Sequence, residues 1–168
     1  FFDLLKMIVG ETDISKKWRT LLHRSAILAG QSQNSNDLTS CFLWNVIVLE
    51  MLLTEADEKI SESLVKRSNY FLGWNEEWEN EEYKSRIKAI YKKRSDFVHI
   101  GDIKYIEIQD LLFTDDLIFN ILNNIVKCRD KIKDRKDIID FCKKHEAAQL
   151  LNLESKYQFG KFEIVRKT

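Results

Sequence analysis

The sequence predicts an all-α protein, a helical bundle of about five to six helices. The chain has no proline and only five glycines in 168 residues, which leaves long helices uninterrupted. Apolar residues also recur with a spacing near 3.6 through most of the chain. We expect one domain over 1–168, with a core at about 14–150 and a tail at 151–168. Because the chain begins with Phe1 and not with methionine, we expect either the C-terminal part of a longer protein or a processed chain.

The expected helices follow one another with short connections. Their predicted bounds are residues 14–29, 38–54, 56–72, 79–98, 108–127 and 135–150. The second helix is apolar on almost every side, a pattern typical of the central helix of a bundle. A polar loop at 31–36 precedes it, and Asn36 or Asp37 is expected to cap its first turn.

Glycines and acidic residues indicate where the later helices begin and end. Gly73 is expected to stop the third helix and Gly101 the fourth. The acidic run at 75–82 suits the electropositive first turn of the fourth helix. Residues 157–165 alternate apolar and polar side chains, which predicts a short strand or an extended partner-binding arm in the tail.

The composition excludes several classes of protein. With 27 basic and 27 acidic residues, the net charge gives no sign of a nucleic acid partner, and only the distribution of charge can do so. Three cysteines without C-x-x-C spacing indicate free thiols in a reducing compartment. No apolar run approaches the roughly 20 residues that cross a bilayer, so we expect a cytoplasmic protein with no membrane partner. Cys142 and His145 form an isolated C-x-x-H, so neither a metal nor a cofactor is expected.

Arg94 and His99, near the end of the fourth predicted helix, could together cleave RNA without a metal. Such cleavage needs a base to deprotonate the 2′-hydroxyl, an acid for the leaving 5′-oxygen and a cation at the phosphate. Histidine, with an ordinary pKa near ~6.5, can do either proton transfer. Arginine stays charged and offers a planar fork of donors to phosphate oxygens. The two residues are therefore a candidate catalytic pair, and the alternative is that their placement is incidental.

The spacing of this pair poses a geometric problem. Five residues span about 500° of an ideal helix, so the two side chains point about 140° apart. They converge only if the helix loosens at Val98 and His99, or if two molecules assemble the site. Gly101 directly afterwards is compatible with the loosening.

A basic stripe on the same helix has two interpretations. Its members are Lys84, Arg86, Lys88, Lys92, Lys93 and Arg94, with no acidic residue between Tyr83 and Ser95. One interpretation is a helix that grips an RNA backbone, with contacts from Lys88, Tyr91, Lys92 and Lys93. The other is a solvated helix face with cations near its C-terminal end.

Glu50 interrupts the apolar second helix. A buried carboxylate needs a partner, because an unpaired buried charge is costly. A structural salt bridge to Arg67 or Arg94 is one expectation. A role in orienting the catalytic arginine or histidine is the other.

With these features in place, the chain resembles the HEPN superfamily, and most closely its ApeA-like group of prokaryotic defence proteins. The likeness covers roughly 38–127. It rests on Val48–Leu53, on Val65–Leu72 and above all on Ile90–Gly101, which is similar to the group's signature Y-x-x-R-S-x-φ-V-H-x-G.

The resemblance implies an all-α protein that forms a homodimer. It also implies a metal-independent endoribonuclease that acts in antiphage defence, abortive infection or toxin–antitoxin systems. A sensor domain or an antitoxin would be a further partner. Arg94 would bind the scissile phosphate and His99 would transfer protons. Ser95 or Asp96 would tune the site, and Asp96 could orient the imidazole of His99. The alternatives are a non-catalytic HEPN-type module for dimerisation or for binding RNA or nucleotide, and a generic helical interaction domain.

Overall fold

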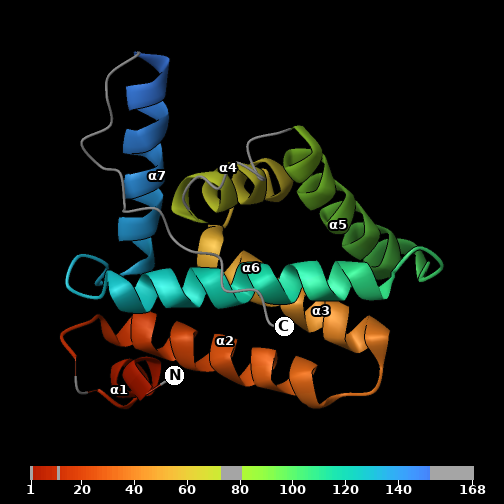
Figure 1. The fold of residues 1–168 in the computed structure, drawn as a ribbon, viewed down its shortest axis with the longest axis horizontal. Coiled ribbons are helices and arrows are strands. Elements are labelled where there is room, and N and C mark those ends of the chain that lie inside the picture. The colour runs from red at the N-terminus through yellow and green to blue at the C-terminus, as the bar shows by residue number, and fades with distance from the viewer. Residues whose placement is uncertain (1, 11, 73–80, 152–168) are drawn as a thin grey trace.

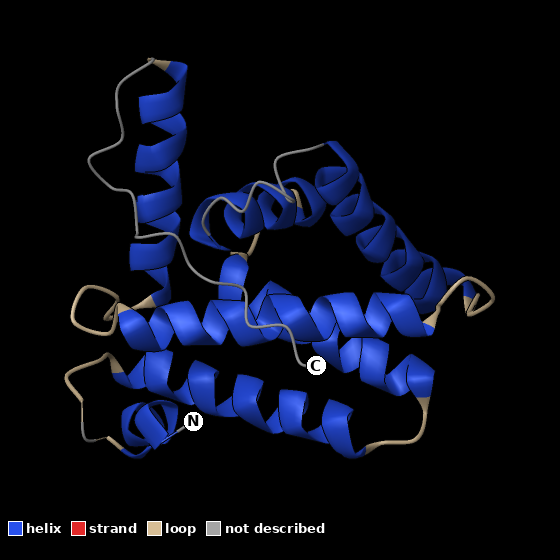
Figure 2. Cartoon of the chain, in the orientation of Figure 1, coloured by secondary structure: helices blue, strands red, loops and turns tan. Residues whose placement is uncertain are grey.

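The computed structural model describes residues 2–10, 12–72 and 81–151, and every regular element among them is a helix (Figures 1 and 2). The elements are α1 (Phe2–Val9), α2 (Lys16–Asn34), α3 (Leu38–Leu53), α4 (Ile60–Leu72), α5 (Glu81–Ile100), α6 (Ile108–Lys127) and α7 (Arg135–Leu150). The predicted all-α bundle is thereby confirmed. The described part of the chain has seven helices, where five to six were expected.

The central position predicted for the second helix is confirmed by α3. This helix packs against α2, α4 and α6, and eight of its residues, mostly apolar, are buried. Of the two expected caps, Asp37 is the one used, because its carboxylate accepts the backbone N–H groups of Thr39 and Ser40. In Figure 1, α4 and α5 cross above α6, and α7 stands steeply to it at one end.

Several boundaries differ from the predicted ones, including the start of α2 at Lys16 rather than at 14 and the end of α5 at Ile100 rather than at 98. The first helix extends to Asn34, so most of the expected polar loop at 31–36 is helical. It extends because Ser32 faces inward and is buried: its hydroxyl donates to the carbonyl of Cys41 at 3.2 Å, and the Cys41 thiol donates back to the Ser32 carbonyl at 3.1 Å. The short helix α1, which carries the fully buried Met7, was not predicted.

The start of α4 also differs, since the helix begins at Ile60 rather than at 56. Asp57 has a positive φ of 66°, which no residue inside a right-handed helix adopts. The Glu58 carboxylate accepts the backbone N–H of Glu55 and holds this turn outside the helix. The expected stop at Gly73 and the predicted strand or arm at 157–165 lie outside the described residues.

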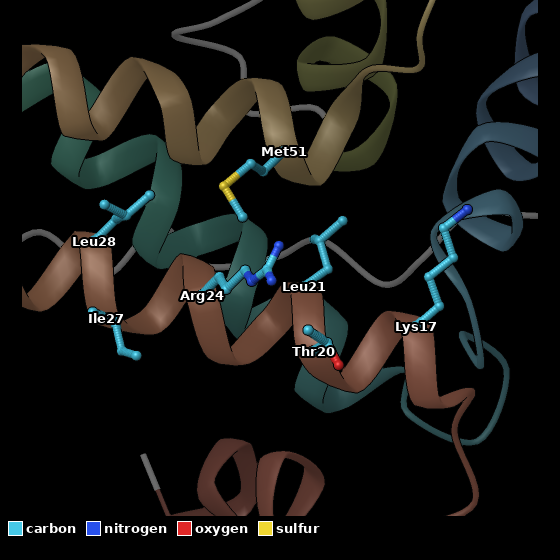
Figure 3. A pocket seen from close by; sticks show the side chains of 7 residues that line it. All are labelled: Lys17, Thr20, Leu21, Arg24, Ile27, Leu28 and Met51. Atoms are coloured by element: carbon cyan, nitrogen blue, oxygen red, sulfur yellow. The ribbon is translucent and has the colours of Figure 1, made fainter.

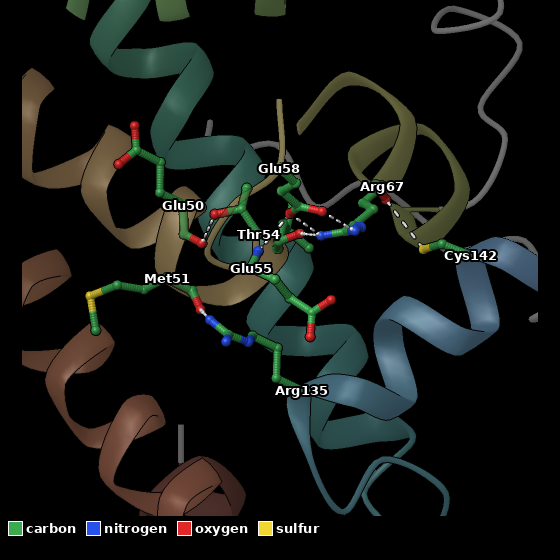
Figure 4. Close-up of polar contacts among 9 residues, drawn as sticks. Glu50, Met51, Thr54, Glu55, Glu58, Arg67, Arg135 and Cys142 are labelled. Carbon is green, nitrogen blue, oxygen red and sulfur yellow. Dashed lines mark hydrogen bonds and ion pairs between the residues drawn. The ribbon is translucent and has the colours of Figure 1, made fainter. Parts of the chain in front are cut away.

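Two arginines bind the C-terminal end of α3 (Figure 4). Arg67 of α4 is 8% exposed and donates to the Leu53 carbonyl at 2.6 Å, while Arg135 of α7 donates to the Met51 carbonyl at 3.3 Å. Cations are favourable at a helix C-terminus, where carbonyl groups lack intrahelical partners. These contacts fix α4 and α7 relative to the central helix.

Candidate functional site

The helix α5 carries both predicted catalytic residues and ends where the sequence indicated. Gly101 adopts a φ of +74°, and its N–H donates to the carbonyl of Phe97 at 2.8 Å, so it terminates the helix in a left-handed conformation. The helix continues through Ile100, however. Of the two alternatives for convergence, the loosening at Val98 and His99 does not occur, and within one chain the two side chains leave a regular helix in different directions.

Arg94 is held from the central helix by Glu50. Its Nη2 donates to Oε2 of the carboxylate at 3.3 Å, and its Nε lies 3.2 Å from Oε1. The side chains are 22% and 15% exposed, respectively. Burial raises the pKa of Glu50, and the guanidinium of Arg94 opposes that rise.

Of the two partners expected for Glu50, Arg94 is the one that the structure shows. Arg67 instead forms a bidentate pair with Glu58, with N–O distances of 2.6 and 2.7 Å. Figure 4 shows the Glu50 carboxylate directed away from that pair. The close contact between Arg94 Nε and Glu50 Oε1 lacks hydrogen-bond geometry, and both atoms are buried without another partner in the described chain. Glu50 therefore accepts only one hydrogen bond from the guanidinium, at Nη2, although arginine carries five N–H donors.

His99 lies at the surface, within a stretch of the chain that has several exposed apolar side chains. We call this set the α5–α6 apolar turn; it consists of Val98, Ile100, Ile103, Tyr105, Ile108 and Leu112. All six are at least 50% exposed, and Ile100 is 77% exposed. Apolar groups concentrated on a surface mark sites that another molecule covers. The sequence did not predict this surface, because its residues belong to three segments: the end of α5, the connection between α5 and α6, and the start of α6.

The two predicted tuning residues make no observed contact with His99. Asp96 accepts a hydrogen bond from Lys92, one turn earlier on the same helix. This hydrogen bond is also the main reason that the pKa of Lys92 is raised. Ser95 is partly buried. In a single chain, therefore, Asp96 serves a helix-surface ion pair rather than the imidazole.

Some side chains of the basic stripe contact neighbouring helices, and others are exposed to solvent. Lys93 forms an ion pair of 2.7 Å with Asp110 of α6, and Arg86 lies 4.2 Å above the ring of Phe113. Tyr91 is partly buried against the core. Of the residues predicted to contact RNA, Lys88 and Lys92 are exposed, whereas Lys93 and Tyr91 face neighbouring helices.

Asp110 is a residue that the sequence analysis missed. It accepts the Glu107 backbone N–H at 2.9 Å in a capping box and binds Lys93 at the same time. The sequence signal was weak, because the usual capping box pairs Ser or Thr with Glu or Gln three residues later, whereas here the two positions are Glu107 and Asp110. Asp110 thus ties the start of α6 to the segment of α5 that carries Arg94.

His145, the histidine of the isolated C-x-x-H, packs inside the bundle. His145 is buried against Phe141 and Tyr70, and burial lowers its pKa. No group of three or more potential metal-ligating side chains occurs within 2–10, 12–72 and 81–151. No helix in the same ranges has the length and apolar character to cross a membrane.

Comparisons of this chain with models of protein families, with curated proteins and with solved structures give no match.

Proposed function

We propose that this chain is a metal-independent endoribonuclease of the HEPN type, whose site is completed by a second copy. The observation that supports it is the placement of Arg94 and His99 on the last turns of α5. The arginine is oriented from the central helix by Glu50, and the histidine is exposed beside the α5–α6 apolar turn. A second copy seated on that apolar turn would bring its own pair to the same cleft.

The proposed chemistry needs no group beyond those residues. The imidazole of one His99 accepts the proton of the ribose 2′-hydroxyl, and the 2′-oxygen attacks phosphorus. The bond to the 5′-oxygen breaks, and the second copy's His99, in its protonated form, donates a proton to that oxygen. The products are a 2′,3′-cyclic phosphate and a free 5′-hydroxyl. Arg94 stabilises the negative charge that develops on the phosphate oxygens.

In this scheme Glu50 is a positioning residue. Its contact at 3.2–3.3 Å holds the guanidinium in one orientation but leaves donors available to a phosphate. The exposed Lys88 and Lys92 would bind the RNA backbone outside the cleft. We place this activity in prokaryotic antiphage defence or toxin–antitoxin biology, in the cytoplasm, with a sensor domain or an antitoxin as the controlling partner.

The test compares the parent chain with His99→Ala on a pooled RNA substrate in buffer that contains EDTA. We expect cleavage to fall by about 100-fold or more, because general acid–base catalysis by one group contributes that much. His23→Ala, which removes an exposed histidine of α2, is the matched control and should cleave like the parent. Mapped ends should carry a 2′,3′-cyclic phosphate. Undiminished cleavage by His99→Ala, with the helical circular dichroism unchanged, would refute the proposal.

A second candidate function is a non-catalytic HEPN-type module for dimerisation or RNA binding. It is favoured by the ion pairs that occupy Lys92, Lys93 and Arg94 within the fold. RNA binding or dimerisation without any cleavage by the parent chain would support this function instead.

A further inference from the structure

The face of α2 that borders α3 is hollowed into an open groove (Figure 3). A hollow of about 710 Å³ is lined by Lys17, Thr20, Leu21, Arg24, Ile27, Leu28 and Met51. A smaller one of about 180 Å³ shares Lys17 and Leu21 with it and continues to Arg135 and Lys136 at the start of α7. The two hollows therefore adjoin each other along α2, and we call them together the α2–α3 groove.

The groove has an apolar floor with cations along it. Four lining residues follow one another at i, i+4, i+7 and i+11 on one face of α2, in the order Lys17, Leu21, Arg24 and Leu28. Such a run spans about 16 Å, or three helical turns. Figure 3 shows Leu21, Arg24 and Leu28 extending toward α3, from which Met51 extends toward them. Ile27, at the edge, is 47% exposed.

The charge of the groove indicates the chemistry of its occupant. Among the described residues that line it, four are cationic and two, Glu55 and Asp134, are acidic. Asp134 is already occupied by the Ser15 hydroxyl and by the first turn of α7, which lowers its pKa. Arg24 and Lys17 are exposed. An occupant therefore needs apolar side chains for the floor and carboxylates for the cations.

We propose that the α2–α3 groove binds an acidic amphipathic helix of a partner protein. Leucine-like residues at i, i+4 and i+7 of that helix pack on Leu21, Leu28 and Met51. Flanking glutamates or aspartates pair with Arg24 and Lys17. An open groove about three turns long with a mixed apolar and cationic lining suits this mode of helix recognition.

This proposal is independent of the proposed nuclease. Glu50 and Met51 are neighbours in sequence but leave α3 in different directions. Glu50 reaches Arg94 on α5, while Met51 lines the groove against α2. A partner in the groove would thus occupy a different face of the central helix from the Arg94 site.

The experiment measures the anisotropy of a fluorescein-labelled 15-residue helical peptide, with leucines on one face and glutamates beside them, on titration with the full chain. We expect saturable binding, and at least about fivefold weaker binding to Arg24→Glu, since reversing one charge replaces an attraction with a repulsion. Lys16→Glu is the matched control, because Lys16 is an exposed cation of α2 that does not line the groove. It should bind like the parent chain.

A charge-swapped peptide makes the test specific. The same peptide with lysines in place of glutamates should bind the parent chain more weakly and should prefer Arg24→Glu. Equal binding of both peptides to both proteins would overturn the proposal. So would binding of dodecanoate in the groove without any binding of the acidic peptide. Self-association of the chain that Arg24→Glu abolishes would assign the groove to a second copy and would also overturn it.

Discussion

At the scale of single residues, the Arg94–Glu50 pair is the most informative contact of the candidate site. A carboxylate in the central helix costs free energy unless it is paired, and removing one partner leaves the other buried and charged. The pKa of Glu50 is raised by burial even with Arg94 present. Its protonation state should therefore control the stability of any variant that lacks the arginine.

Arg94→Met tests this dependence, because methionine retains the apolar length of the side chain without its charge. Without the guanidinium, the pKa of Glu50 should lie further above its ordinary value of 4.5. A raised folded-state pKa stabilises the fold below the unfolded pKa, and that stabilisation is lost as pH rises through the folded value. We expect the variant to lose about 1–3 kcal/mol near neutral pH and less near pH 5. Urea unfolding at the two pH values measures the difference.

Glu50→Gln supplies the control for that experiment. The double variant Arg94→Met with Glu50→Gln has no titrating group at this position, so its deficit relative to Glu50→Gln should not change between the two pH values. A deficit of Arg94→Met that is constant with pH would contradict a charged Glu50 as its cause.

At the scale of the elements, the sequence predicted the helices well where both periodicity and an end signal were present. Asp37 and Gly101 mark real ends, and α3, α6 and α7 lie within a residue of their predicted bounds. One failure came from a tertiary contact and another, at the start of α4, from the local turn that Asp57 and Glu58 form. The sequence places Ser32 in a polar loop, but Ser32 is buried and forms two reciprocal hydrogen bonds with Cys41. In the candidate site, the sequence predicted a salt bridge from Glu50 to Arg67 or Arg94, but only the structure shows that Arg94 is the partner. The pairing of Asp96 with Lys92 could not be predicted, because Lys92 and His99 both lie about one turn from Asp96.

Replacing Gly101 or Gly30 with alanine should change the stability of the chain in opposite directions. Gly101 has a φ of +74° and no atom within 4 Å of an added Cβ, so Gly101→Ala meets no clash and only the left-handed backbone opposes it. We expect a loss of about 1 kcal/mol. Gly30 lies inside α2 with the same open space but ordinary helical geometry. Gly30→Ala should therefore stabilise the chain by about 0.5–1 kcal/mol.

Thermal and urea unfolding of the two variants measure both changes. A gain of stability in Gly101→Ala would show that α5 does not end in the left-handed conformation beside His99. A loss in Gly30→Ala would show that this part of α2 is not a regular exposed helix.

At the scale of the whole molecule, the regular course of α5 and the exposed surface beside it belong together. One helix cannot bring Arg94 and His99 to the same phosphate while it remains helical through Ile100. The α5–α6 apolar turn offers a surface for a second copy next to His99. A symmetric dimer buries the same patch of both chains, so two α5 ends would meet across its axis.

Mixing the parent chain with an inactive variant tests that arrangement. His99→Ala should fail to cleave RNA alone. After random exchange with a ninefold excess of this variant, only about a tenth of the parent chains still pair with another parent chain. Because the proposed mechanism takes its base and its acid from the two copies of His99, we expect cleavage by a fixed amount of parent chain to fall to about a tenth. Ile100→Glu, placed in the apolar turn of the inactive variant, should prevent this inhibition by weakening its association with the parent chain. Undiminished cleavage, although mass shows that mixed dimers form, would mean that one intact chain suffices, and the site shared between two chains would have to be abandoned.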